Sequence, residues 1–500
     1  MTTTAPGPIP TDTPGPPDAG ATTRAPETGT SPVTFVARTV VPAAMFLATL
    51  VVMVRTAAAP LSNPDTFFHL RFGREFLEGW SLRSPGHVTS WATADWVPTQ
   101  WLPQEVMAQF DQWFGLPGVA WLAGLQFVGL ALTFYLAARR WADRVVTAPL
   151  VVVALLACAP SISMRPQVLS YLATTLVTAL WLAVRAGSRR SPWWLVPLLW
   201  VWAMCHGMWP LGVIVSAVAV LGLVLDGVVR GRRALLLGAV PVVAGLAGGL
   251  LTPVGAKLLP AVLLVNSRGQ YFSEWKPPDF TMPNCLALLL LLLVTVLVMV
   301  KRSADWTTIL LVGLAAGFAV YSARTVPVAA ALLVPVAAAQ LQRVVGPVRR
   351  QRRRERLFAV GSSVTALVVL ALLVPTTSDH TPPQPEWVDG AFASMPAGTR
   401  ILDESVFGGF LMYRYPDLDF MFSGYGDIYT THELETMSKI NDLQPGWDDM
   451  IRDAQPAYAF LDPETPLGYA LVHSEGWTVV EDSEDVQLLA PPPGWMSDSD

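Results

Sequence analysis

The sequence predicts an all-α polytopic membrane protein with about eleven transmembrane helices and a small α/β domain at its C-terminal end. Of its 500 residues, 52% are hydrophobic and 14% are charged, as in chains that cross a membrane repeatedly. Charge divides the chain, because residues 376–500 hold 23 acidic and 4 basic side chains while the remainder is basic. We therefore expect a membrane core over residues 33–375 and an acidic domain over residues 376–500.

The first 32 residues are predicted to form a disordered cytoplasmic tail. They are rich in Thr, Pro, Gly and Ala and hold almost no large apolar side chains, so they bury too little surface to fold. The apolar run that follows has no signal-peptide cleavage pattern, so we expect it to be kept as a membrane anchor.

Apolar runs long enough to cross a hydrocarbon core of roughly 30 Å predict about eleven transmembrane helices. Cys158, Cys205 and Cys285 all lie in apolar stretches and are interpreted as small core residues, not as parts of a disulfide framework. The predicted spans lie near residues 35–58, 116–138, 145–160, 167–184, 193–206, 209–229, 234–251, 284–300, 306–322, 327–342 and 357–375.

Basic residues between the spans predict the orientation of the chain. They gather in five alternate loops, which places those loops, and the N-terminus, in the cytoplasm. The acidic C-terminal domain is then extracytoplasmic. The run Arg349–Arg356 is interpreted as an orientation signal beside anionic lipid, and nucleic acid is not an expected partner. The five loops contain Arg139, Arg140 and Arg144; Arg185, Arg189 and Arg190; Arg230, Arg232 and Arg233; Lys301 and Arg302; and residues 343–356.

Two extracytoplasmic loops are too long to be simple turns. The first, residues 59–115, contains two amphipathic helical stretches, Pro64–Gly79 and Pro103–Phe114. Six tryptophans lie between Trp80 and Trp121, which is typical of helices at the membrane interface. The second loop, residues 252–283, contains the apolar run Leu258–Val265.

The C-terminal domain alternates between strand-like and helical patterns, which predicts a small α/β layer. The predicted strands are Arg400–Asp403, Phe410–Tyr415, Leu418–Phe422, Ala457–Leu461 and Trp477–Val480, and the predicted helices are His432–Leu443, Trp447–Ala454 and Pro466–Gly476.

Asp65 is the leading catalytic candidate. With Pro64 as the first helical residue, Asp65 and His69 are four positions apart and share one helix face. A carboxylate there can take a proton from an attacking hydroxyl, or hold a divalent cation with a neighbouring group. The structural alternative is that Asn63 caps the helix and Asp65 complements the dipole of its first turn.

Arg165 and Arg324 follow spans on the extracytoplasmic side, where the orientation rule does not expect basic residues. Ionisable side chains close to the bilayer are costly and indicate a functional site by default. A guanidinium at this surface is suited to bidentate binding of a phosphate or pyrophosphate. The alternative for each is contact with a lipid headgroup or snorkelling from the end of a span.

His206 and Glu274 are predicted at the same face. His206 lies among small and aromatic residues at the end of a span and is either a substrate-binding group or a hydrogen-bonded packing histidine. Glu274 can be a second carboxylate, can face a carbohydrate together with Trp275, or can anchor its loop by pairing with Lys276.

These residues also carry a family resemblance, which covers roughly residues 40–490. The chain resembles a large bacterial family of polytopic proteins whose architecture is similar to the class C (GT-C) glycosyltransferases. The motifs, in order, are Asp65-Thr-Phe-Phe-His-Leu-Arg with Gly73, Arg165-Pro-Gln, Trp202 to His206-Gly, Thr252-Pro-Val-Gly255, Glu274-Trp, Arg324-Thr-Val-Pro, Gly408-Gly-Phe and Gly424-Tyr-Gly-Asp-Ile-Tyr429.

Two positions depart from the family pattern. Members often have an acidic residue where Asn63 stands, and a tryptophan pair where Phe67 and Phe68 stand. The loss of one carboxylate weakens the expectation of a metal site in this loop. No metal ligand set is assigned, and a divalent cation is kept only as an alternative.

The resemblance implies a membrane glycosyltransferase that moves a sugar from a polyprenyl-phosphate donor to an envelope glycan, lipid or protein acceptor on the extracytoplasmic face. Class C enzymes place an acidic residue in the first outer loop, which maps to Asp65. We expect catalytic roles for Asp65 and His69, and substrate binding by Arg165, His206, Glu274 and Arg324. The alternatives are a transporter or flippase of lipid-linked intermediates, and a non-catalytic subunit of envelope assembly.

The predicted orientation can be tested by cysteine labelling. A cysteine introduced at Ser474, in the acidic domain, should react with a membrane-impermeant reagent in intact cells. One introduced at Gly187, in a basic loop, should react only after lysis, and the unmodified protein gives the background. The opposite pattern would place Asp65 in the cytoplasm.

Overall fold

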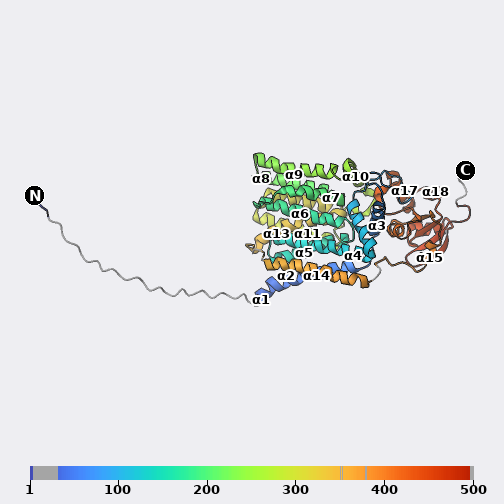
Figure 1. Ribbon diagram of the computed structural model, residues 1–500, viewed down its shortest axis with the longest axis horizontal. Coiled ribbons are helices and arrows are strands. Elements are labelled where there is room, and N and C mark those ends of the chain that lie inside the picture. Colours follow the sequence, from blue (N-terminus) through green and yellow to red (C-terminus); the bar gives the residue numbers. More distant parts are fainter. Residues whose placement is uncertain (4–31, 349–350, 352, 378–379, 496–500) are drawn as a thin grey trace.

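The computed structural model describes residues 1–3, 32–348, 351, 353–377 and 380–495 (Figure 1). A bundle of helices forms one part of the molecule and a C-terminal α/β domain, called the cap below, forms the other. The predicted fold class is confirmed: the protein is a mostly helical, multi-pass membrane protein with a small C-terminal sheet. The tail predicted over residues 1–32 falls almost wholly outside the described residues.

All eleven predicted apolar runs form helices. Among the described residues, eight segments are long and apolar enough to span a membrane. The other three predicted spans form shorter helices. The eight segments contain α2 (Val41–Ala58, preceded by α1, Pro32–Phe35, and η1, Val36–Val40), α4 (Trp101–Arg139), α5 (Arg144–Cys158), α6 (Gln167–Arg185), α9 (Gly231–Leu250), α11 (Pro283–Arg302), α13 (Val326–Val345) and α14 (Arg353–Thr377). The shorter helices are α7 (Leu195–Cys205), α8 (Pro210–Leu225) and α12 (Trp306–Tyr321).

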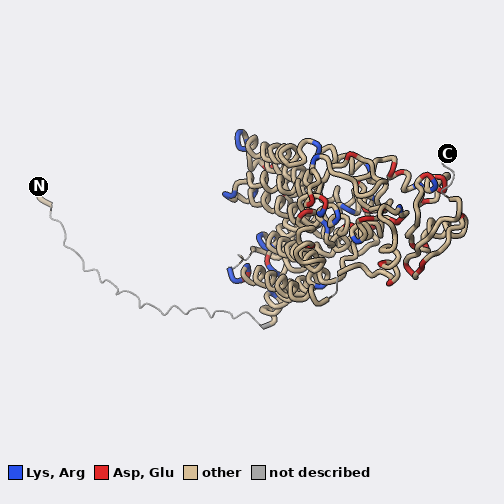
Figure 2. The backbone as a smooth tube through the Cα atoms, turned by 45° about the vertical axis from the view of Figure 1, so that its right-hand side comes forward, with Lys and Arg blue, Asp and Glu red and all other residues tan. Residues whose placement is uncertain are grey.

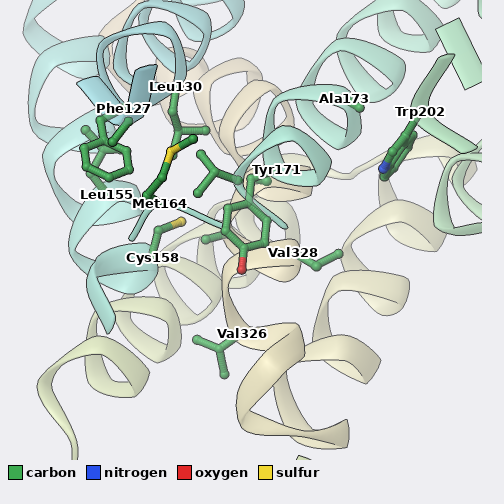
Figure 3. Packing of buried hydrophobic residues seen from close by; sticks show 14 of the residues in the cluster. Phe127, Leu130, Leu155, Cys158, Met164, Tyr171, Ala173, Trp202, Val326 and Val328 are labelled. Carbon is green, nitrogen blue, oxygen red and sulfur yellow. The ribbon is translucent and has the colours of Figure 1, made fainter. Parts of the chain in front are cut away.

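Helix α13 lies at the centre of the bundle, where it contacts α4, α5, α6, α11 and α12. Its residues from Val326 to Ala338 are all buried, and most are Ala or Val, whose small side chains let neighbouring helices approach closely. Figure 3 shows the packed interior around Tyr171 of α6, close to Cys158. Tyr171 is fully buried, and the three cysteines are buried and free.

The charged residues are distributed unevenly along the molecule. In Figure 2, loops rich in Lys and Arg gather at the end of the bundle farthest from the cap, whereas acidic segments gather on the cap. A buried pair anchors the basic end, because Arg139 Nε lies 2.6 Å from Glu355 Oε1. This pair joins the end of α4 to the beginning of α14.

Helix α3 (Pro64–Leu77) lies between the bundle and the cap (Figure 1). It packs against α4 and against α16 (Ser405–Arg414) of the cap. Asn63 begins it by accepting a hydrogen bond from the Asp65 N–H at 3.0 Å. One face of this helix is covered by protein, since Phe67, Phe68 and Phe72 are buried. The expected location of the helix at the membrane interface stays a prediction.

The second predicted amphipathic stretch is the first part of α4. The helix begins at Trp101 and bends at Gly115, whose φ of 65° and ψ of −167° are not helical. Trp113 and Phe114, just before the bend, are exposed, as expected of aromatic side chains at an interface. The second long loop contains α10 (Leu258–Ser267), an apolar helix too short to be counted with the eight.

The cap contains a five-stranded mixed sheet in the order β2-β1-β3-β5-β4. Strand β1 pairs in parallel with β2 and β3, with Ile401 opposite Phe420 on one side and Tyr458 on the other. β5 pairs antiparallel with β3 and β4. The strands are β1 (Arg400–Asp403), β2 (Asp419–Phe420), β3 (Tyr458–Leu461), β4 (Thr478–Asp482) and β5 (Gln487–Ala490), and the helices are α15 (Trp387–Ala393), α16 (Ser405–Arg414), α17 (Thr431–Asn441), α18 (Trp447–Ala454) and α19 (Pro466–His473).

One predicted strand, Phe410–Tyr415, is wrong, because this segment belongs to α16. Its apolar run is short enough to suit either structure, and tertiary packing decides between them. Gly408 and Gly409 bring the helix close to its neighbours: a Cβ on Gly409 would lie 2.4 Å from the Pro64 carbonyl oxygen of α3. β5 and α15 were not predicted.

The contact between α16 and α3 gives a stability prediction. Gly409→Ala should lower the free energy of unfolding by about 1–3 kcal/mol, because its methyl group would overlap a backbone carbonyl that cannot simply rotate away. Gly390→Ala is the matched control, since the space around Gly390 in α15 is open. Thermal melting of both variants in detergent checks this, and equal melting temperatures would contradict it.

Candidate active site between the bundle and the cap

Six side chains predicted from distant parts of the sequence line one cavity of about 380 Å³. They come from α3, the loop before α6, the end of α7, the second long loop and the turn η7 (Ala323–Thr325) before α13. The cap closes another side with Ser405 and Gly424–Asp427. The six residues are Asp65, His69, Arg165, His206, Glu274 and Arg324.

Arg165 joins the two carboxylates of this set. One of its guanidinium nitrogens, Nη2, lies 2.6 Å from Asp65 Oδ2, and Nη1 lies 2.6 Å from Glu274 Oε1. Nη2 also donates to Glu274 Oε2 at 3.2 Å, so the contact with Glu274 is bidentate. Only 11% of the Arg165 side chain is exposed. The planar fork of Arg165 is therefore already occupied by carboxylates.

Arg324 is held less tightly. Its Nη1 lies 3.5 Å from Glu274 Oε2, and its guanidinium stands over the Trp275 ring at 5.3 Å, a cation–π arrangement. Glu274 thus pairs with the two arginines of the cavity and not with Lys276, the alternative considered from the sequence. Because its ionic contact is longer, Arg324 retains more capacity than Arg165 to bind another anion.

The pKa values of the two carboxyl groups are shifted in opposite directions. Burial raises the pKa of Asp65, and the nearby charge of Arg165 offsets only part of this effect. Burial also opposes ionisation of Glu274, but its hydrogen bond and ion pair with Arg165 outweigh burial and hold its pKa below the ordinary value of 4.5. A carboxylate with a raised pKa is the stronger base of the two.

His69 and His206 are both buried in the cavity wall. The Gln104 amide lies 3.0 Å from His69 Nδ1, and Ser170 Oγ lies 2.9 Å from His206 Nδ1. The Met208 N–H also donates to His206 Nδ1, at 3.3 Å, so this nitrogen is an acceptor. Burial lowers the pKa of both rings well below 6.5, and the charges of the two arginines lower it further. Both histidines are neutral groups, suited to orienting a ligand through hydrogen bonds.

The cap contributes residues to which the sequence analysis gave no role. Tyr425 and Asp427 line the cavity from the turn after β2, and Ser405 lines it from the start of α16. The sequence did contain a signal for this turn, because residues Gly424–Tyr429 form one of the motifs that carry the family resemblance. Among the many acidic residues of the cap, however, nothing in the sequence marked Asp427 as facing the cavity.

The residues of the cavity do not form a dedicated metal site. Across the described part of the chain, no group of three or more His, Cys, Asp or Glu side chains is arranged to hold a metal ion. Asp65 and Glu274 are both engaged by Arg165, and the Asn63 side chain caps α3.

Comparisons with known proteins show the fold. No family model and no curated protein matches the chain. Among solved structures, ArnT from Cupriavidus metallidurans bound to undecaprenyl phosphate aligns over 93% of this chain and 100% of its own, at 15% identity and a TM-score of 0.50. The archaeal oligosaccharyltransferase AglB from Archaeoglobus fulgidus, in complex with an inhibitory peptide and a dolichol-phosphate, aligns over 90% of this chain and 74% of its own, at 11% identity and a TM-score of 0.50. Both are GT-C membrane glycosyltransferases, so the predicted GT-C-like architecture is confirmed.

The contacts of Arg165 predict its effect on stability. Arg165→Gln should lower the free energy of unfolding by about 3 kcal/mol, because two carboxylates would lose their shared partner inside the protein. Arg324→Gln should cost less, since its contact with Glu274 is longer.

A double variant separates charge from packing. In Arg165→Gln, Glu274 keeps its contact with Arg324, whereas Asp65 loses its ion pair. Adding Asp65→Asn removes the charge of Asp65, so it should recover part of the lost stability. Chemical or thermal unfolding of the purified variants measures this recovery. Additive losses in the double variant would show that the two residues do not interact.

Proposed function

We propose that the protein is an integral membrane glycosyltransferase that transfers a sugar from a lipid-phosphate donor to an acceptor on the extracytoplasmic face. The observation that carries this proposal is the Asp65 carboxylate, held by Arg165 at 2.6 Å in a cavity that also contains Arg324. The shared fold supports the donor class, because the solved ArnT structure binds undecaprenyl phosphate and the AglB structure binds a dolichol-phosphate.

Asp65 acts as the general base in this reaction. An acceptor hydroxyl attacks the anomeric carbon of the donor sugar while Asp65 takes its proton. The bond between the anomeric carbon and the phosphate oxygen breaks, and the lipid phosphate leaves with the electron pair. Arg324 stabilises the charge that develops on the departing phosphate.

Arg165 and Glu274 act through position and charge. Because Arg165 already holds both carboxylates, its role is to orient Asp65 and to favour its ionised form. Glu274 holds Arg324 through a longer contact, which an incoming phosphate can replace. His69 and His206, both neutral, orient the acceptor hydroxyl through hydrogen bonds.

The acceptor class follows from the predicted location. A site on the extracytoplasmic side of a bacterial cytoplasmic membrane has access to envelope glycans such as polysaccharides, to lipids and to exported proteins. A non-catalytic assembly subunit would tolerate the loss of Asp65, which makes this residue the decisive one to change.

Asp65→Asn should reduce turnover at least 100-fold, because an amide cannot accept the proton. The melting temperature should stay close to that of the parent, since Asn63 still caps α3 and Arg165 keeps Glu274. Purified protein is incubated with a panel of polyprenyl-phosphate sugars, and consumption of the donor is followed. Glu105→Gln is the control, as Glu105 also lies in the first turns of a helix but outside the cavity.

The pH profile of the parent protein gives a second readout of the same group. Only ionised Asp65 is a base, and burial raises its pKa above 3.8, so kcat/KM should fall as the pH falls through that raised value. The effect of pH on the free energy of unfolding has the opposite sign, because stability contributed by protonated Asp65 is present at low pH and lost as the pH rises through the same value.

A fully active Asp65→Asn variant would remove Asp65 from the mechanism.

A further inference from the structure

A turn of the cap, residues Gly424–Tyr429, reaches into the cavity from the side opposite the membrane helices. It follows β2, contains η8 (Gly426–Ile428) and leads into α17. Tyr425 and Asp427 from this turn line the cavity together with Arg324. This turn is thus the point where a domain outside the bundle places a charged group in the candidate active site.

The turn is held rigidly from the cap side. Gly424 has a φ of +81°, a backbone conformation that suits glycine. The Tyr429 hydroxyl donates to the Met421 carbonyl at 2.8 Å and accepts from the Ser423 N–H at 2.9 Å.

The two outer loops clamp the same turn. Arg268, in the second long loop, donates from Nη1 to the Tyr429 carbonyl at 2.8 Å. A Cβ on Gly426 would lie 2.1 Å from the Phe272 ring, so this close approach requires glycine. The Tyr425 ring packs 4.7 Å from the Phe68 ring of α3. Because all these contacts fix the backbone, Asp427 is presented to the cavity in one position.

The surroundings of Asp427 are suited to a ligand with hydroxyl groups. Thr99 Oγ1 lies 3.5 Å from Asp427 Oδ2, a long contact that leaves acceptor capacity on the carboxylate. Burial raises the pKa of Asp427, and the Tyr425 hydroxyl and the charges of Arg324 and Arg268 counteract this effect. Aromatic residues complete the wall of the cavity, as in many binding sites for small polar ligands: Phe68, Tyr271, Phe272, Trp275 and Tyr425.

The charged side chains that line the cavity indicate which class of sugar it can bind. Three carboxylates line it, those of Asp65, Glu274 and Asp427, against two guanidinium groups, those of Arg165 and Arg324. Arg165 is occupied by Asp65 and Glu274, and the proposed function assigns Arg324 to the phosphate. Among the described lining residues, no cation is left for a carboxylate on the sugar.

We propose that Asp427 is a specificity-determining residue that binds hydroxyl groups of the donor sugar and selects uncharged sugars over acidic ones. The inference rests on the proposed function, because it takes the phosphate of the same donor to lie at Arg324. Arg324 and Asp427 line the same cavity, so one donor can place its phosphate at Arg324 and its sugar at Asp427. A sugar carboxylate in this position would meet the negative charge of Asp427, and the two like charges would repel each other.

The experiment measures binding of three probes to the purified full-length protein. The probes are polyprenyl phosphate alone, polyprenyl-phosphate-glucose and polyprenyl-phosphate-glucuronate, the last two differing only at C6 of the sugar. The parent protein should bind the glucose probe at least tenfold more tightly than the glucuronate probe. Asp427→Asn should reduce this ratio below threefold, while it binds polyprenyl phosphate alone as tightly as the parent or more tightly.

Two control variants locate the effect. Asp485→Asn removes an exposed carboxylate of the cap far along the chain from this turn, and it should keep the parent ratio. Arg324→Gln should weaken binding of all three probes, because all carry the phosphate.

The outcomes separate this inference from the proposed function. If the parent binds polyprenyl phosphate but Asp427→Asn keeps the parent ratio, the specificity role is overturned and the proposed function stands. If Asp427→Asn also loses polyprenyl phosphate and melts at a lower temperature, Asp427 is structural and the inference is again overturned. If no probe binds the parent, the donor class itself is wrong, and both proposals fail.

Discussion

The guanidinium of Arg165 joins Asp65 of α3 to Glu274 of the second long loop, and the geometry of the cavity follows from these contacts. Paired charges are tolerated in a poorly hydrated site only when each has a partner in good geometry. Arg165 therefore fixes α3 relative to the loop that carries Glu274 and Trp275. Through Glu274 it also limits the position of Arg324. The positions of the proposed base and of the proposed phosphate-binding group thus depend on one side chain, that of Arg165.

Much of the fold could be predicted from the sequence because a membrane imposes a strong length constraint. A run such as Leu286–Val300 in α11 has few alternatives to a spanning helix. The sequence of the cap constrains its secondary structure less strongly. The segment Phe410–Tyr415 is short and largely apolar, and in the folded protein it belongs to a helix that packs against α3 and β2. The burial of α3 was missed for a related reason, since an amphipathic helix covered by a domain has the same sequence pattern as one covered by lipid.

The candidate site could be predicted residue by residue but not as an arrangement. Arg165 and Arg324 stood out because arginine is unexpected on that side of a span, a signal that needs no knowledge of neighbours. The pairing of Arg165 with Asp65 depends on how α3 packs, which one sequence does not reveal. Asp427 had no such contrast, because the domain around it is acidic throughout. The predicted position of a residue relative to the membrane helped to identify site residues in the bundle. In the cap it gave no such information.

The covering of α3 by α16 has a consequence for biogenesis. α3 is made early in translation, whereas α16, which buries its aromatic face, belongs to the last part of the chain. Until that part has been synthesised and has folded, Phe67 and Phe68 have no cover from the cap, and the cavity lacks the wall formed by Gly424–Asp427. The chain must therefore be synthesised at least as far as Asp427 before the cavity has all of its walls, so the cavity is completed only after the bundle helices have been made.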